Sequence, residues 1–159
     1  MSFEEKIAEI MTERGLTVAV AETTAGGLVS SRLVSVPGSS KYFLLGAVAY
    51  SKESKVKLLG ISEKFLKENG TVTQETAFAM AEAVRRVAGA DIGLAETGIA
   101  GPIRGRSPKP IGTACIAVST PNETKVVTNQ YDGDRNAIRE AIAEGVLAEL
   151  LECLTPRDQ

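Results

Sequence analysis

The chain has 159 residues and a formal net charge of −2, from 18 basic and 20 acidic side chains. This near-neutral balance argues against nonspecific binding to nucleic acid or to an anionic membrane through the net electrostatic field. The chain contains no histidine, which removes the usual general base and the usual zinc ligand, so acid–base chemistry must use Lys, Glu, Asp or Tyr.

The length fits one domain, because a domain of about 150 residues buries roughly two-thirds of its unfolded surface without disulfides or metals. We therefore expect a single domain over residues 1–159, with a polar tail from about residue 155. No apolar stretch approaches the roughly 20 residues that span a bilayer, which predicts a cytoplasmic protein without membrane contact. Cys115 and Cys153 lie far apart in apolar runs, and we interpret them as small buried hydrophobic residues.

The N-terminal region is predicted to form a helix followed by a buried strand. Ser2 and Glu5 fit a capping box, and apolar residues then recur at helical spacing until Gly15 ends the pattern. Residues 17–22 follow as a near-continuous apolar run, which is typical of an internal strand covered on both faces. The polar residues that come next therefore stand at the carboxyl end of a buried strand.

A second helix and a second strand follow. Gly26 and Gly27 open the helix, and Pro37 with Gly38 stops it. Residues 43–50 are again apolar and are predicted to form a second buried strand. A polar segment comes directly after them, so this strand also ends in functional groups.

Helices dominate the middle of the chain. One short helix is predicted to end at Gly60, a second begins at Ser62, and Thr73 caps a longer one. Residues 91–96 then form a third short strand. The segment 103–110 holds three cations and two prolines, which indicates a loop of restricted conformation.

The last third is predicted to form a hairpin and a helix. Residues 111–119 and 124–131 alternate in polarity around Pro121 and Asn122, which is the pattern of an antiparallel hairpin. The last helix runs from about residue 134 to residue 154.

This order of elements predicts an α/β fold, a three-layer α/β/α sandwich with a mixed, mostly parallel sheet and an antiparallel hairpin. Short parallel strands need crossover helices, and both faces of such a sheet must be covered. If the first three strands run parallel, the polar loops after residues 22, 50 and 96 meet at one edge of the sheet. Ligands of open α/β sheets bind at such edges, so we expect the functional site there.

The loop after the first strand holds the first candidate residues. Unpaired backbone amides of Gly26 and Gly27, at the start of a helix, can bind an anion. The alternative is a tight strand-to-helix turn in which Thr23 or Thr24 is merely the N-cap. Glu22 ends a buried strand, and its carboxylate needs a hydrogen-bond donor.

Tyr50 and Lys55 lie five residues apart across the second strand-to-helix junction, which can bring a phenol and an ammonium to one pocket. A lysine deprotonates a hydroxyl only if burial or a nearby cation lowers its pKa toward neutrality. The alternative is that Lys52, Lys55 and Lys57 form a solvated helix face, and spacing alone favours it.

Small residues follow the third strand, where a ligand or another backbone could come close: Thr97, Gly98, Ala100 and Gly101. Arg104, Arg106 and Lys109 add charge that suits a phosphate. Arg135 and Arg139 form either a local salt-bridge face or a second phosphate contact. The segment has neither the lysine of a P-loop nor the spacing of a dinucleotide motif, and a structural turn explains each glycine taken alone.

Several short stretches of the chain match the motifs of a known family in content and in order. They are Ala21–Gly27, Val36–Ser40, Ala49–Val56, Leu58–Gly60, Thr97–Pro102, Lys109–Gly112 and Gly133–Arg135 with Ile138–Arg139. On these stretches the sequence resembles the CinA C-terminal domain family over nearly the whole chain. The resemblance implies a nicotinamide mononucleotide deamidase, which hydrolyses the carboxamide to nicotinic acid mononucleotide and ammonia. It implies no cofactor and no metal.

The resemblance also implies roles for individual residues. The family's nucleophile is a serine after the glutamate, assisted by a tyrosine and a lysine, and these positions hold Thr23, Tyr50 and Lys55. In the implied mechanism the loop amides hold the oxyanion, and Arg104, Arg106 or Arg139 meets the phosphate. The expected substrate contacts are Glu22, Thr24, Gly26, Gly27, Ser39, Thr97, Gly98, Ala100, Gly101, Arg104, Arg106 and Arg139.

Two departures from the family pattern bear on activity. Thr23 stands where serine is expected, and its extra methyl restricts the rotamer and crowds the attacked carbonyl. Residues 103–106 replace a glycine run with bulk and charge near the expected phosphate site. The alternative function is therefore a noncatalytic nucleotide-binding or regulatory member of the family.

The expected partners follow from the same observations. We expect a small-molecule nucleotide as substrate, no direct contact with nucleic acid because no DNA-reading motif is present, and a homo-oligomer in which a second subunit completes the site. A role in nucleic-acid metabolism through a protein partner ranks last. The N-terminal nucleotide-hydrolase-like domain that is frequent in the family is not found in this sequence, so a stand-alone form is expected.

Overall fold

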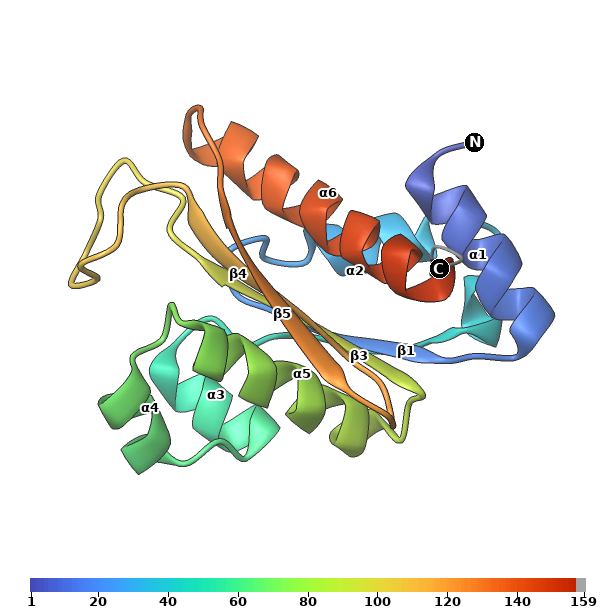
Figure 1. Cartoon of the computed structure of the whole chain (residues 1–159), viewed down its shortest axis with the longest axis horizontal. Helices are drawn as coiled ribbons and strands as arrows, with labels where there is room; N and C mark the ends of the chain where they lie inside the picture. The colour runs from blue at the N-terminus through green and yellow to red at the C-terminus, as the bar shows by residue number, and fades with distance from the viewer. Residues whose placement is uncertain (157–159) are drawn as a thin grey trace.

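In the computed structural model, which describes residues 1–156, six α-helices cover the two faces of one five-stranded sheet (Figure 1). The elements in chain order are α1 (Phe3–Arg14), β1 (Val18–Glu22), α2 (Leu28–Val34), the 3-10 helix η1 (Ser39–Lys41), β2 (Phe43–Val48), α3 (Lys52–Leu59), α4 (Glu63–Asn69), α5 (Gln74–Ala88), β3 (Ile92–Gly98), β4 (Thr113–Ser119), β5 (Thr124–Gln130) and α6 (Arg135–Leu154). None of these helices is long and apolar enough to cross a membrane. Of the expected polar tail, residues 157–159 lie outside the described part of the chain.

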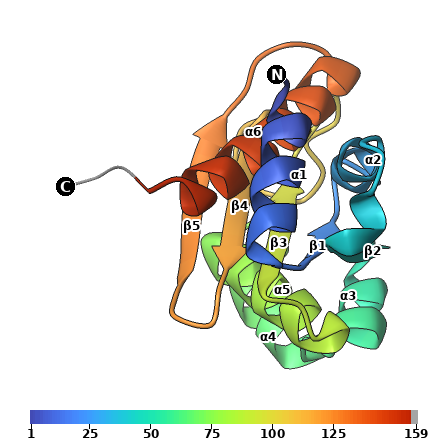
Figure 2. The same ribbon diagram turned by 90° about the vertical axis from the view of Figure 1, so that its right-hand side faces the viewer.

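The sheet has the strand order β2-β1-β3-β4-β5. β1 pairs in parallel with β2 and with β3, whereas β4 pairs antiparallel with β3 and with β5. Helices α1, α2 and α6 lie on one face, and α3, α4 and α5 lie on the other (Figures 1 and 2). The predicted α/β fold with a mixed sheet and an antiparallel hairpin is confirmed.

The strands differ in burial as their places in the sheet require. β1 lies between β2 and β3, and all five of its residues are buried, as predicted. The prediction of a second buried strand was wrong. β2 is an edge strand whose alternate residues are exposed, with Leu44 and Val48 close to half exposed, because it has a partner on one side only.

Local sequence sets where most helices begin. In five helices a backbone amide of the first turn donates a hydrogen bond to the side chain of the residue before the helix: Ser2, Ser51, Ser62, Thr73 and Asp134. The capping box of Ser2 and Glu5 is present as predicted. α2 is different, because Gly27 precedes it in a left-handed conformation and offers no side chain as a cap. Its first amides donate instead to the carboxylate of Glu22, the last residue of β1.

Two cores flank the sheet. The core under α1, α2 and α6 is built from aliphatic side chains, whereas the core under α5 is rich in alanine. A Cβ atom on Gly93 would lie 2.1 Å from the Ala81 carbonyl oxygen of α5, so glycine allows this helix to lie close to β3. Cys115 is buried as predicted, but Cys153 is only half-buried.

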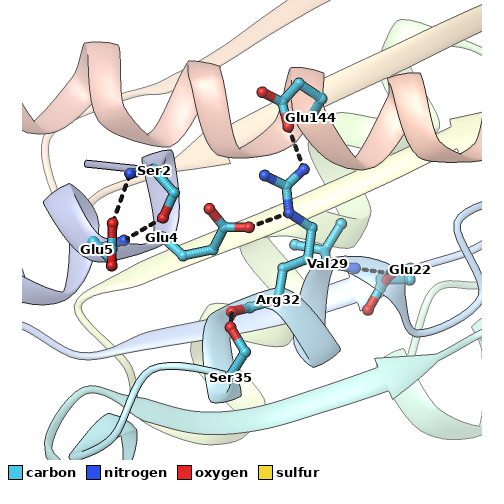
Figure 3. Close-up of polar contacts among 8 residues, drawn as sticks. All are labelled: Ser2, Glu4, Glu5, Glu22, Val29, Arg32, Ser35 and Glu144. Carbon is cyan, nitrogen blue, oxygen red and sulfur yellow. Dashed lines mark hydrogen bonds and ion pairs between the residues drawn. The ribbon is translucent and has the colours of Figure 1, made fainter.

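An ionic cluster joins the helices on the first face. Arg32 of α2 contacts Glu4 of α1 and Glu144 of α6, as Figure 3 shows. Three helices that are far apart in the sequence therefore meet at one guanidinium. This cluster fixes α2 against its neighbours and so fixes the helix that begins directly after the candidate loop.

Candidate active site

The carboxyl ends of β1, β2 and β3 open onto a cavity of about 710 Å³. Its wall includes Thr23 and Thr24 after β1, Tyr50 and Lys55 after β2, and the segment from residue 97 to residue 101. The prediction that three polar loops converge at one edge of the sheet is therefore confirmed. A second cavity, of about 760 Å³, lies between α5 and the connection from α3 to α4, and none of the candidate residues line it.

Thr23 and Lys55 meet at one backbone carbonyl. The Lys55 ammonium donates to the Ala49 carbonyl oxygen at 2.7 Å, and the Thr23 hydroxyl donates to the same oxygen at 3.4 Å. Lys55 also donates to the Tyr50 carbonyl oxygen at 3.3 Å. The expected nucleophile and the expected base are thus neighbours.

Lys55 is fully buried, so the alternative of a solvated helix face was wrong for this residue, although Lys57 is exposed. The cap of Ser51 starts α3 directly after the strand and directs Lys55, on the first turn, back toward the end of β2. Burial lowers the pKa of Lys55 to about 8, and the charge of Glu96 opposes this shift. The neutral amine that a base requires is therefore accessible near neutral pH.

Tyr50 reaches the site mainly through its backbone. Its side chain is 60% exposed, and its hydroxyl accepts a hydrogen bond from Arg135 at 3.4 Å rather than contacting Thr23 or Lys55. Its carbonyl oxygen receives Lys55. Tyr50 therefore lies at the rim of the cavity, close to the cationic wall.

Glu22 serves the fold rather than the cavity. Its buried carboxylate accepts the backbone amides of Gly27, Val29 and Ser30 at 2.9–3.1 Å, together with the Ser30 hydroxyl at 2.7 Å. The contact with Val29 is drawn in Figure 3. The N-terminus of α2 thus already holds an anion supplied by the chain, and Gly26 with Gly27 forms the tight turn that was the alternative interpretation.

Two further candidates, Arg139 and Ser39, lie outside the cavity wall. Arg139 of α6 donates to the carbonyl oxygens of Thr24 at 3.0 Å and Ala25 at 3.1 Å. Ser39 belongs to η1, which precedes β2 and lies at the opposite end of that strand from the cavity. The structure does not bring Glu22, Gly26, Gly27, Ser39 or Arg139 into the cavity wall.

Thr24 and Thr97 bind neighbouring backbone at the cavity wall. The Thr24 hydroxyl donates to the Gly98 carbonyl at 2.9 Å and accepts the Gly98 amide at 3.0 Å, which ties the loop to the end of β3. The Thr97 hydroxyl donates to the Thr71 carbonyl at 2.7 Å. Both residues, with Gly98, Ala100 and Gly101, line the cavity as expected.

Besides Lys55, six basic side chains line the cavity: Lys52, Lys67, Arg104, Arg106, Lys109 and Arg135. Two of them are anchored, because Lys109 donates to the Val72 carbonyl at 2.6 Å and Arg135 donates to the Gly101 carbonyl at 2.8 Å. Arg104 and Arg106 are exposed on the loop, so their guanidinium groups are accessible to a ligand. This wall suits an anionic ligand such as a phosphate.

Comparisons with known proteins identify the family of the chain. The family model described as the CinA C-terminal domain matches residues 1–154. The chain belongs to the CinA C-terminal domain family. A CinA-like protein of Syntrophobacter fumaroxidans is 43% identical over 152 residues, and a putative competence-damage inducible protein of Clostridioides difficile is 42% identical over 149 residues. These matches cover 96% and 94% of this chain but 36% of each relative, so the chain spans about a third of their length.

Solved structures show the same fold. A competence or damage-inducible protein from Enterobacter asburiae has a TM-score of 0.92 at 33% identity, and the match covers 96% of each chain. A competence/damage inducible protein from Agrobacterium tumefaciens has a TM-score of 0.85 at 33% identity, covering 97% of this chain and 99% of the other. The three-layer arrangement described above is thus the fold of solved CinA-type proteins.

Glu96 is a site residue of this CinA C-terminal domain that sequence reasoning missed. One oxygen of its fully buried carboxylate accepts the backbone amides of Thr23 at 2.6 Å and Ala25 at 2.8 Å. Burial raises the pKa of Glu96 to about 7, although these two hydrogen bonds lower it. The signal was present, because an acidic residue inside the apolar strand of residues 92–98 needs donors for the same reason as Glu22.

Proposed function

We propose that this chain is an amidohydrolase that converts nicotinamide mononucleotide to nicotinic acid mononucleotide and ammonia. Family membership supports this class of protein, and the sequence resemblance supplies the substrate. The observation that carries the proposal is the Ala49 carbonyl oxygen that receives both the Thr23 hydroxyl and the Lys55 ammonium inside a cation-lined cavity. A hydroxyl beside a buried lysine is a recognised arrangement for attack on an amide.

In the proposed reaction, neutral Lys55 accepts the Thr23 hydroxyl proton while the oxygen attacks the carboxamide carbon. The C–N bond then breaks, and Lys55 returns the proton to the departing nitrogen, which leaves as ammonia. Water hydrolyses the resulting ester with Lys55 again as base, which releases the carboxylic acid and restores the Thr23 hydroxyl. One water is consumed in each cycle, and no redox partner is needed.

The oxyanion of this reaction needs donors other than those first expected. The amides of Thr23 and Ala25 are bound by Glu96, and the amide of Gly27 is bound by Glu22. The Thr24 amide has no acceptor among residues 1–156, and Thr24 lines the cavity. We assign the oxyanion to this amide, and the phosphate to Arg104 and Arg106, whose planar guanidinium groups match phosphate oxygens.

The test is ammonia release from nicotinamide mononucleotide by the purified protein. We expect release by the parent chain, a loss of at least about 100-fold in kcat for Thr23→Ala and Lys55→Ala, and a faster reaction for Thr23→Ser. The Thr23→Ser gain follows because serine lacks the methyl that restricts the hydroxyl rotamer. Release that is unchanged in Thr23→Ala would contradict the assignment of the nucleophile.

The second candidate function is nucleotide binding without turnover. It is favoured by one observation, the occupation of the Thr23 and Ala25 amides by the Glu96 carboxylate, which removes two donors from the reaction centre. Calorimetry that shows binding of the mononucleotide, together with no ammonia from either the parent or Thr23→Ser, would select this function over the hydrolase.

A further inference from the structure

A buried carboxylate lies behind Thr23, and the proposed reaction does not use it. Glu96 of β3 is 0% exposed. Its Oε1 atom accepts the Thr23 and Ala25 amides at 2.6 and 2.8 Å, whereas its Oε2 atom has no hydrogen-bond partner within residues 1–156. A buried carboxylate oxygen without a donor is costly, so its position calls for a functional explanation.

Lys55 is a second buried ionisable side chain near Thr23. It is also 0% exposed, and two of its three N–H groups are used by the Ala49 and Tyr50 carbonyls. Glu96 and Lys55 do not form a contact ion pair in the described chain, but both are fully buried and both have contacts next to Thr23. Each charge favours the ionised form of the other. Thr23 therefore has its amide on the acid, and its hydroxyl shares an acceptor with the base.

The other charged groups around Lys55 do not duplicate the effect of Glu96. Glu22 of β1 is held by three backbone amides and a hydroxyl at the start of α2, and its charge raises the pKa of Glu96. The phenol of Tyr50 contacts Arg135. The remaining charges on the cavity wall are the cations Lys52, Lys67, Arg104, Arg106, Lys109 and Arg135. Glu96 is the acid whose charge acts on Lys55.

We propose that Glu96 is a positioning residue: one of its carboxylate oxygens holds the Thr23–Ala25 loop, and its buried negative charge is the counter-charge of Lys55. The kinetic part of this proposal rests on the proposed amidohydrolase function. Burial alone drives Lys55 toward the neutral amine, and Glu96 works against burial. Burial is the larger effect, and the acid limits how far it lowers the pH at which Lys55 becomes available as the base for Thr23.

The decisive variant is Glu96→Gln, because the amide oxygen of glutamine still accepts the two loop amides while the negative charge is lost. We expect the pKa of Lys55 to fall by about one unit or more, since loss of a nearby opposite charge disfavours the charged amine. The measurement is a pH titration of the lysine 13Cε signals, with Lys55 assigned by its absence in Lys55→Met. The matched control is Glu13→Gln, an exposed acid at the end of α1, which should leave this pKa unchanged.

The same variants are then compared in the pH profile of kcat/KM for ammonia release. We expect the acidic limb of the Glu96→Gln profile to move to lower pH by the shift that NMR measures. An unmoved limb, in a variant that still releases ammonia, overturns the kinetic part while the proposed function stands. A shifted Lys55 titration in proteins that release no ammonia supports the coupling and refutes the proposed function.

A reciprocal measurement keeps the proposal testable if Glu96→Gln does not fold. Coupling between two titrating groups acts equally in both directions, so Lys55→Met should raise the pKa of Glu96 above its value in the parent. The 13C signal of the Glu96 carboxyl reports this pKa directly. An unchanged Glu96 titration in Lys55→Met, or an unchanged Lys55 titration in Glu96→Gln, overturns the proposal.

Discussion

At the residue scale, the site is defined by two buried ionisable side chains of opposite charge. Glu96 and Lys55 are both fully inaccessible to solvent. Burial raises the pKa of Glu96 and lowers the pKa of Lys55, so it favours the neutral form of each side chain. Such shifts appear as a dependence of folding stability on pH, because the folded and unfolded chains then bind different numbers of protons. The ionisation of these two side chains can therefore be detected from the pH dependence of folding stability, without a substrate.

The free energy of unfolding should fall as the pH rises from about 4.5 to about 7. In this window the unfolded Glu96 loses its proton while the folded one, with its pKa raised to about 7, retains it. The folded state then binds more protons, so stability decreases with pH, by an amount of about 3 kcal/mol for this group alone. Above pH 8 the sign reverses, because folded Lys55 loses its proton before the unfolded lysine does.

The measurement for this prediction is urea unfolding of the parent and Glu96→Gln at pH values from 5 to 10. The difference in stability between the two proteins should change with pH up to about 8, where Lys55 of the parent has also titrated, and level off above it. A difference that stays constant between pH 5 and pH 7 would show that Glu96 ionises normally in the folded chain.

Substitutions of Arg104 and Arg139 should affect different kinetic parameters. Arg104 is exposed on the cavity wall, so Arg104→Ala should raise KM for the mononucleotide about tenfold and leave kcat nearly unchanged, which is the loss expected for one charged contact. Arg139 instead holds the loop carbonyls, so Arg139→Ala should lower kcat. Steady-state kinetics of both variants test this difference, and equal effects on KM alone would contradict it.

At the element scale, α2 depends on a side chain from the strand before it. Gly27 cannot cap the helix, and Glu22 supplies the acceptors for the first amides. The same glycine turn frees Thr23 and Thr24 to face the cavity. A single strand-to-helix connection thus contributes a structural carboxylate and two cavity residues.

Replacement of Glu22 should destabilise this element strongly. Glu22→Ala removes four hydrogen bonds to a buried charge, and we expect a loss of about 3 kcal/mol or more in the free energy of unfolding. Ser30→Ala removes only one of these contacts and should cost about 1 kcal/mol. Urea denaturation measures both, and similar losses in the two variants would argue against the capping role.

The elements themselves were well predicted from sequence, because caps and periodicity are local properties. Ser2, Thr73 and the hairpin turn at Pro121 each indicate their element through neighbouring residues. The burial of β2 was mispredicted because an apolar run does not reveal the order of strands in the sheet. The partners of Glu96 and Arg139 were missed for a related reason, since both bind a loop more than 70 residues away.

At the scale of the whole molecule, the alanine-rich face lets α5 lie close to the sheet. Gly93 is the point of closest approach, because an added Cβ atom would lie 2.1 Å from the Ala81 carbonyl oxygen. α5 contacts β1, β3, β4 and β5, so a displacement of this helix would affect most of the sheet. The distance between α5 and the sheet therefore depends on the absence of a side chain at Gly93.

We expect Gly93→Ala to cost about 3 kcal/mol in the free energy of unfolding, because a rigid backbone atom must move. Gly89 is a suitable control, since it ends the same helix with φ of 63° and has no atom within 4 Å of an added Cβ. Gly89→Ala should cost only about 1 kcal/mol, from the left-handed backbone. Thermal unfolding of both variants tests the prediction, and equal losses would show that close packing is not the cause.

The loop of Thr23, Thr24 and Ala25 has a consequence for the order of assembly. Its amides are held by Glu96, which lies 71 and 73 residues later, and its carbonyls by Arg139, 114 and 115 residues later. During synthesis, this loop therefore cannot take its final shape until α6 has been made. A chain truncated by protease or premature termination before α6 lacks both hydrogen bonds from Arg139 to the Thr24 and Ala25 carbonyls. The shape of a loop in the first fifth of the chain thus depends on the last helix.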